Sequence, residues 1–333
     1  MSVLALNSNI YHKMTSHFTK LLLFLTPVVF AQHKISVQDS LTQAPVPYVT
    51  VSLLNGYGIY TDANGQASVQ EAGITTVELS SIGYQTKKVT LENSSSVVYL
   101  HPEPYSIEAV IIGNPMVIDK TKVFKPKSHQ NEAKMAVGRV GISYAIYIPT
   151  TPEGFLSNLA LPLMKNDFVV NTATKDDVFK ERAYKTLVKI EFLDNNDGAP
   201  GQKFSDFEQV ITVGNANPKL CEVALDENVA LPENGLFVKL TILGKADDAG
   251  NMITEMPYDV VIDRDGKQTH RWKQMQPNFP LYEVSKGQIP AYTTNAFASD
   301  GTWKPVDKPL MFDPDKVYNG FTIGVGYTVI SYK

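Results

Sequence analysis

Hydrophobic and polar residues alternate with a period of two along much of this chain, which is the pattern of β-strands with one buried face. The first of these runs contain Ile35, Val37, Val49, Val51 and Leu53. Asp, Ser and Pro fill the segment 39–47 between them, and these residues favour turns. The segment 61–65 predicts a tight hairpin, because Asn64-Gly65 can adopt positive φ.

The same alternation continues through the second half of the chain. Residues 140–148 alternate, and in 187–192 Leu187, Lys189 and Glu191 alternate with Val188, Ile190 and Phe192. Further strands are predicted at 209–213, 220–225, 236–243, 258–262 and 321–332. Turn-forming clusters of Asp, Asn and Gly separate them, and no long helical period interrupts them. We therefore expect an all-β protein with a larger β-sandwich in this half.

Length and composition suggest two domains joined by a linker. A chain of 333 residues with 43% hydrophobic and 19% charged residues can bury two cores. We expect the domains at 32–112 and 135–333. The linker at 113–134 begins with Gly113-Asn114-Pro115 and contains spaced lysines, which are typical of a solvated connection. Contact of these lysines with a membrane surface or a polyanion stays as an alternative.

Residues 1–31 have the pattern of a secretory signal peptide. Lys13 and Lys20 precede an apolar run over 21–30, and Val29-Phe30-Ala31 suits a cleavage site. This run of about ten residues is shorter than the ~20 that a membrane-spanning helix needs. Starts at Met1 and at Met14 fit equally well. We expect export to the periplasm, the outer-membrane surface or the medium, with no transmembrane segment after removal of the signal.

Several segments of the first domain resemble the carboxypeptidase regulatory-like domain of Bacteroidetes proteins. They are Asp39-Ser40, the stretches 45–49, 61–65 and 80–84, and the segment 106–112, which resembles the closing strand of that domain. The resemblance covers about residues 33–112. It implies a seven-stranded, transthyretin-like β-sandwich in an envelope protein, with an accessory role and no peptidase residues.

A second resemblance concerns the larger domain. The stretches 189–193, 198–201 and 231–238 are similar to jelly-roll domains of secreted Bacteroidetes proteins and of carbohydrate-binding modules. It implies a jelly-roll-like β-sandwich, and nothing about a ligand.

Charge and cysteine content exclude some classes of function. The formal net charge is −4 and the lysines and arginines form no stripe, so we expect no nucleic acid as a partner. The single cysteine, Cys221, lies in an alternating segment and is expected to be a buried thiol.

The sequence offers no catalytic, cofactor-binding or metal-binding set of residues. We find no nucleophile motif, no zinc motif and no phosphate-binding glycine loop. The histidines after the signal are scattered at His33, His101, His129 and His270. Structural calcium at Asp194, Asp197, Asp247 and Asp248 is an alternative to ordinary turn-forming aspartates.

Four aromatic residues are candidates for contact with a ligand: Trp272, Trp303, Tyr282 and Tyr292. Trp272 and Trp303 stand in segments that read as polar and loop-like, and aromatic faces beside polar groups can stack on sugar rings. The competing interpretation is that each tryptophan covers the core at a sheet edge.

We therefore expect a non-catalytic exported envelope protein, which binds or scaffolds another envelope protein through exposed strand edges. The alternative is a carbohydrate-binding accessory protein that binds polysaccharide with the aromatic residues of the second domain. A hydrolase with a dispersed site is the third hypothesis.

Overall fold

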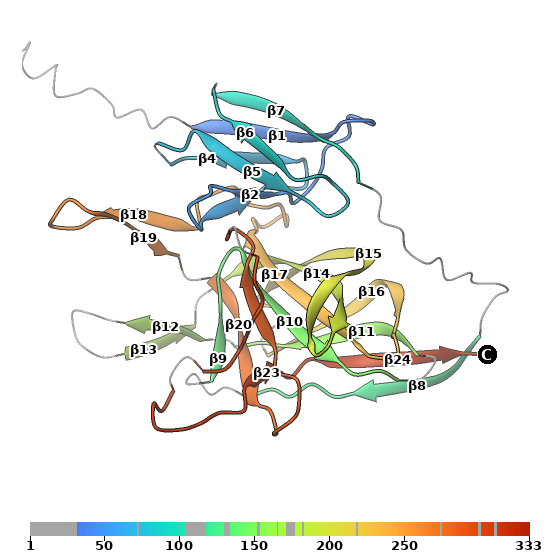
Figure 1. Cartoon of the computed structure of the whole chain (residues 1–333). Coiled ribbons are helices and arrows are strands. Elements are labelled where there is room, and N and C mark those ends of the chain that lie inside the picture. Colours follow the sequence, from blue (N-terminus) through green and yellow to red (C-terminus); the bar gives the residue numbers. More distant parts are fainter. Residues whose placement is uncertain are drawn as a thin grey trace, which may run out of the picture.

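The protein is all-β (Figure 1). The computed structural model describes residues 32–71, 73–92, 94–103, 117–129, 134–151, 154–164, 166–170, 177–181, 183–217, 219–273, 275–298, 301–309 and 312–333. The predicted signal peptide and the predicted closing strand at 106–112 lie outside these ranges. None of the described residues forms a helix that could cross a membrane.

Seven strands form two small sheets in the N-terminal part. They are β1 (His33–Asp39), β2 (Thr50–Ser52), β3 (Gly58–Tyr60), β4 (Gln66–Val69), β5 (Thr76–Ser80), β6 (Lys87–Thr90) and β7 (Ser95–Leu100). The sheet orders are β4-β1-β7 and β3-β2-β5-β6. The predicted alternation holds, since Val37, Val51 and Leu79 are fully buried in the core between the sheets.

Turn chemistry explains how the chain passes between these sheets. The Asp39 carboxylate accepts hydrogen bonds from Leu41 N and Thr42 N, as expected of a turn-forming aspartate. The turn predicted at 61–65 also exists, with Gly65 at φ 70°. The predicted hairpin is wrong, however, because β3 pairs with β2 and β4 pairs with β1. This turn moves the chain from one sheet to the other.

The larger part contains the remaining strands. They are β8 (Ile118–Phe124), β9 (Met135–Gly138), β10 (Ile142–Ile148), β11 (Phe155–Pro162), β12 (Asn166–Val170), β13 (Asp177–Glu181), β14 (Lys185–Asn196), β15 (Ala199–Gly214), β16 (Leu220–Ala230), β17 (Leu236–Lys245), β18 (Tyr258–Ile262), β19 (Gln268–Trp272), β20 (Met275–Glu283), β21 (Tyr292–Asn295), β22 (Lys304–Pro305), β23 (Phe321–Ile323) and β24 (Gly326–Tyr332).

Two sheets of this part enclose the larger core. Their orders are β15-β14-β17-β10-β21-β22 and β16-β11-β24-β8. Val188, Ile190 and Phe192 of β14 are fully buried in this core, and Cys221 of β16 is buried there too, as the alternation predicts. The third sheet has the order β23-β20-β9, and β12–β13 and β18–β19 form separate hairpins.

The predicted linker at 113–134 requires a correction. Its residues 118–124 form β8, which pairs antiparallel with the C-terminal strand β24. The β-branched and aromatic residues Ile118, Thr121, Val123 and Phe124 were the available signal for this strand. The lysines between these residues favoured the linker interpretation, because spaced lysines are common in solvated linkers.

A phenylalanine joins the two parts of the molecule. Phe297 is buried and its ring contacts Tyr60 of β3, with the ring centres 5.3 Å apart. A Cβ atom on either Gly58 or Gly141 would overlap the Phe297 ring, so only glycine leaves room for it. Ser52 Oγ also donates a hydrogen bond to the Phe297 carbonyl oxygen at 3.0 Å.

We expect Gly141→Ala to lower the free energy of unfolding by about 2–4 kcal/mol. The new Cβ would overlap the Phe297 ring, and Gly141 also has a φ of 83° that disfavours other residues. Gly73→Ala is the matched control, because Gly73 has a φ of 85° and open space around it. Its expected loss is about 1 kcal/mol. Urea unfolding checks both, and equal losses would show that Phe297 does not need the space at Gly141.

Candidate interaction surface

The four predicted ligand-contact residues do not form one site. Trp272 lies in β19, not in a loop, and its ring centre is 5.0 Å from that of Tyr57 in the N-terminal part. It packs against the hydrophobic cores of both parts. This position agrees with the interpretation that it covers a core at a sheet edge.

Tyr282 is also separate from the other three. It lies in β20, where its ring meets His129 edge-on with the centres 4.6 Å apart. Lys127 Nζ stands 5.7 Å from the centre of the same ring. Burial raises the pKa of Tyr282.

Tyr292 and Trp303 do come together, beside Tyr147. We call these three half-buried side chains the aromatic face; they lie on the six-stranded sheet and pack against the buried Phe237. Tyr292 OH donates a hydrogen bond to the Gly198 carbonyl oxygen at 3.0 Å. The aromatic face is therefore anchored to the turn between β14 and β15.

Polar amides lie next to the aromatic face. Tyr147 OH donates to the carbonyl oxygen of Asn234 at 3.0 Å. Asn195 and Asn234 donate from their side-chain amides to each other's carbonyl oxygen at 2.7 and 2.8 Å. This arrangement combines flat apolar surface with amide groups, which suits contact with a sugar ring.

A polar cluster holds the β18–β19 hairpin against the N-terminal part. The Glu71 carboxylate accepts a hydrogen bond from Tyr258 OH, and its other oxygen lies 2.9 Å from His270 Nε2. The His270 ring stacks on Tyr57 with the centres 4.3 Å apart. Burial first, and then the hydrogen bond and charge of Glu71, raise the pKa of Tyr258. Every partner is already engaged, so this cluster fastens the hairpin.

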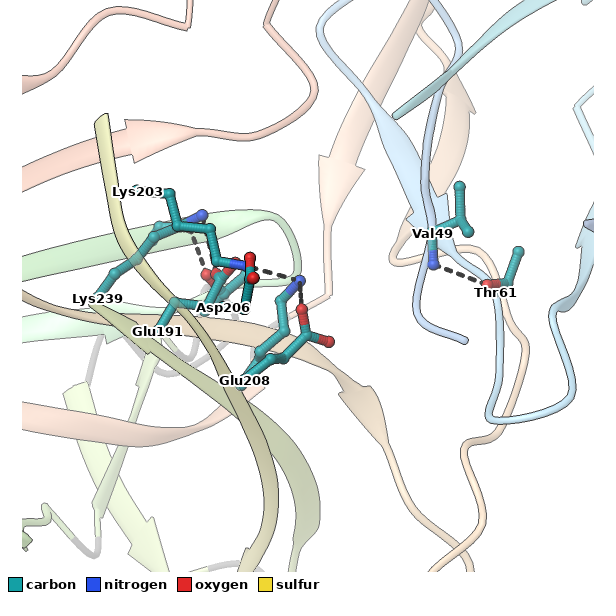
Figure 2. Close-up of polar contacts among 10 residues, drawn as sticks. Val49, Thr61, Glu191, Lys203, Asp206, Glu208 and Lys239 are labelled. Atoms are coloured by element: carbon teal, nitrogen blue, oxygen red, sulfur yellow. Dashed lines mark hydrogen bonds and ion pairs between the residues drawn. The ribbon is translucent and has the colours of Figure 1, made fainter. Parts of the chain in front are cut away.

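A group of charged side chains from the neighbouring strands β14, β15 and β17 comes together on the six-stranded sheet (Figure 2). Glu191 of β14 is 0% exposed, and its Oε2 lies 2.9 Å from Lys239 Nζ of β17. Lys189 Nζ is 3.6 Å from Glu191 Oε1 and 3.5 Å from Glu208 Oε2 on β15. The register places Glu208, Glu191 and Lys239 side by side across three neighbouring strands.

Burial and the two lysines set the protonation of Glu191. Burial raises its pKa, but Lys239 and then Lys189 outweigh burial and lower it to about 2. Tyr60 lies above it on β3, which contacts β17. Burial, followed by the charge of Glu191, raises the pKa of Tyr60. Glu191 is thus a buried anion held by lysines of its own sheet, and its charge acts on Tyr60 of the N-terminal part.

The predicted calcium residues lie on two different turns. Asp247 accepts a hydrogen bond from Asn251 N at 2.8 Å, and this and further hydrogen bonds lower its pKa. Asp194 lies near the end of β14, and Asp197 lies in the turn between β14 and β15. Within the described ranges, no group of three or more His, Cys, Asp or Glu side chains is placed to hold a metal ion.

Strand β8 offers a free edge of seven residues in the described part of the chain. β8 ends the four-stranded sheet, so one side of it pairs with β24 and the other faces outward (Figure 1). Its residues are exposed on both faces from Ile118 to Val123, with Ile118 53% and Val123 64% exposed. Exposed apolar side chains on a free edge are typical of a strand that accepts a partner.

Other edges are shorter or partly covered. The edge strand β3 lies against β17, and β22 has only two residues. The long edge strands β15 and β16 contact each other: Gln209 Nε2 of β15 donates a hydrogen bond to the Ala224 carbonyl oxygen of β16 at 3.0 Å. On the edge strand β7, the Tyr99 carbonyl oxygen already accepts a hydrogen bond from Lys87 Nζ at 3.0 Å. We therefore take β8 as the candidate interaction surface.

We expect Glu191→Gln to lower the free energy of unfolding at pH 7 by about 3 kcal/mol, because Lys239 then loses its buried counter-charge. The pKa of Glu191 is lower in the folded protein than its usual 4.5, so its contribution is present above about pH 4.5. The contribution disappears as the pH falls toward about 2. The difference between the two proteins should shrink over the same range.

Urea unfolding between pH 7 and low pH measures this difference. Glu78→Gln is the control, because Glu78 pairs with an exposed Lys88 at 3.6 Å and should cost less than about 1 kcal/mol. A difference between Glu191→Gln and the unsubstituted protein that stays constant with pH would contradict the lowered pKa of Glu191.

Comparisons with known proteins leave the function to be argued from the chain itself. No family model matches the sequence, and neither a curated protein nor a solved structure matches it.

Proposed function

We propose that this chain is an exported binding module, not an enzyme, and that it contacts another protein of the cell envelope by strand addition at β8. The observation that supports this proposal is the free edge of β8, a strand of seven residues of which six are exposed. An outward-facing edge presents unpaired N–H and C=O groups, which an extended segment of another protein can pair with.

The inner side of β8 is well anchored, so its outer edge is preformed. Phe124 stacks on Tyr327 of β24 with the ring centres 4.4 Å apart. At the other end, Lys333 N donates to the Val117 carbonyl oxygen at 3.0 Å, and Lys333 Nζ pairs with Asp119 at 3.0 Å. A strand that is already extended loses little conformational freedom when a partner binds.

The location in the envelope rests on the sequence. The signal pattern in residues 1–31 supports export, and the resemblance of residues 33–112 to the carboxypeptidase regulatory-like domain supports an accessory role in a Bacteroidetes envelope. Seven strands in two sheets are compatible with that resemblance. In this proposal the N-terminal part supports the larger part, which presents β8.

A photoreactive amino acid placed at Thr121 in the middle of β8 should form an adduct with one envelope protein of the source cell. Mass spectrometry should locate the contact in an extended segment of that partner. The same label at Asp265, an exposed turn residue between β18 and β19, is the control. Adducts of equal yield at both positions would contradict strand addition at β8.

Two proline variants test whether backbone pairing is involved. Neighbouring strand residues point their N–H groups to opposite edges, so one of Lys120→Pro and Thr121→Pro removes an outward donor. That variant should lose the adduct from a label at Val123 and keep its fold by circular dichroism. Unchanged adducts in both variants would show that side chains alone make the contact.

The aromatic face supports a second candidate function, which is binding of a polysaccharide. Tyr147, Tyr292 and Trp303 lie together beside the amides of Asn195 and Asn234. Trp272 is no part of this surface, because it fills the contact between the two parts of the molecule.

For this candidate, Trp303→Ala should weaken polysaccharide binding by about 3- to 10-fold, as expected for the loss of one stacked aromatic ring. Affinity electrophoresis in gels containing envelope polysaccharide measures the change. Tyr282→Phe is a control on a separate surface and should bind normally. If Trp303→Ala binds as well as the unsubstituted protein, the aromatic face is not a glycan site.

A further inference from the structure

We infer that the β8 edge selects an acidic partner strand, with a carboxylate opposite each of Lys120 and Lys122, and that it rejects a second copy of this chain. This inference rests on the proposed function, because it requires that β8 accepts a strand. It adds the chemistry of that strand.

The register places Lys120 and Lys122 on one face of β8. Lys120 lies opposite Ser331 and Lys122 lies opposite Val329, so both follow the same side of β24. Lys122 Nζ stands 4.7 Å over the Phe124 ring, which also lies on this face. This face therefore carries Lys120, Lys122 and Phe124, whereas a register shift at Asp119 pairs Ile118 with Tyr332 and removes it from this face.

Neither lysine has an ion-pair partner among the described residues. The acid next to them, Asp119, is on the opposite face of the strand and pairs with Lys333 at 3.0 Å. Lys125 and Lys127 follow β8 and are exposed as well. The edge thus presents uncompensated positive charge, although the whole chain has a formal net charge of −4.

Pairing geometry works against the β8–β8 registers that overlap the most residues. Two residues that face each other in an antiparallel pair either exchange backbone hydrogen bonds or both point their N–H and C=O groups away from the partner strand. Two copies of β8 can therefore oppose only residues whose numbers have an even sum. Registers centred on Lys120, Thr121 or Lys122 then place lysine opposite lysine, and a register centred on Asp119 places Asp119 opposite its own copy. A parallel pair in register opposes each lysine with itself.

Like charges directly opposite each other destabilise a sheet, so the lysines protect this apolar edge against self-association. The same lysines favour a partner strand with acidic residues, because opposite charges that face each other stabilise a sheet. An antiparallel partner gains most when it offers an apolar residue opposite Phe124 and acidic residues opposite Lys122 and Lys120. Strand β8 can therefore pair with another strand, but it favours a partner strand with acidic residues opposite its two lysines.

A designed peptide pair tests this selectivity. The acidic probe is Val-Ile-Glu-Thr-Glu-Thr-Val, which sets a glutamate opposite each lysine of β8, and the basic probe has lysine in place of both glutamates. Each is displayed in many copies on a soluble carrier, so that weak single contacts add up. A shuffled acidic peptide of the same composition controls for net charge alone.

We expect the full mature chain to bind the acidic probe about ten-fold more tightly than the basic or the shuffled probe at low salt, with a smaller ratio at about 1 M salt. The double variant K120E/K122E should reverse the preference and bind the basic probe. This variant changes only exposed side chains, and it should keep its fold by circular dichroism. The unsubstituted chain should be monomeric in analytical ultracentrifugation.

The outcomes separate the two proposals. Equal binding of the acidic and basic probes, with no reversal in K120E/K122E, would overturn the charge selectivity and leave strand addition standing. A dimer that Thr121→Pro or Lys120→Pro dissociates would overturn the rejection of a second copy. No binding of any probe, together with no β8 adduct in the cell envelope, would overturn strand addition itself.

Discussion

The structure depends on the burial of one anion, the Glu191 carboxylate, between the six-stranded sheet and the N-terminal part. A buried carboxylate needs charged partners, and Lys239 and Lys189 supply them from within the same sheet. This requirement explains why polar residues occupy the outer face of β14 although that face is covered. Strand β3 contacts β17 of the same sheet, and burial, followed by the charge of Glu191, raises the pKa of Tyr60 on β3.

The contact between the two parts therefore combines three different interactions. The charged group lies beneath it, Phe297 fills the space that Gly58 and Gly141 leave free, and Glu71 binds the β18–β19 hairpin through Tyr258 and His270. Each acts at a different place along the contact. The two parts are thus joined by apolar packing and by hydrogen bonds to a buried carboxylate.

Alternation in the sequence predicts most of the strands and the residues that share a face, as β1, β10 and β14 show. It does not reveal what covers the second face: Lys189 and Glu191 read as a solvent face, yet another part of the chain covers them. Turn residues behave similarly. Asn64-Gly65 predicts the turn correctly but cannot tell whether the next strand joins the same sheet or another.

The candidate surface was harder to predict for a related reason. The same lysines that make β8 resemble a linker are those that a free apolar edge needs for protection. The aromatic residues show the converse problem. Trp272 and Trp303 have similar polar neighbours in the sequence, but only the fold separates Trp272, in the contact between the parts, from Trp303, on the six-stranded sheet.

The antiparallel pairing of β8 with β24 has a mechanical consequence. A partner that pulls on β8 along the strand axis loads the whole β8–β24 ladder in shear, so its hydrogen bonds resist together and do not open one after another. The Phe124–Tyr327 stack and the Lys333–Asp119 pair stand near opposite ends of this ladder and oppose sliding in either direction. The β8–β24 ladder should therefore resist tension best when the tension runs parallel to the strands.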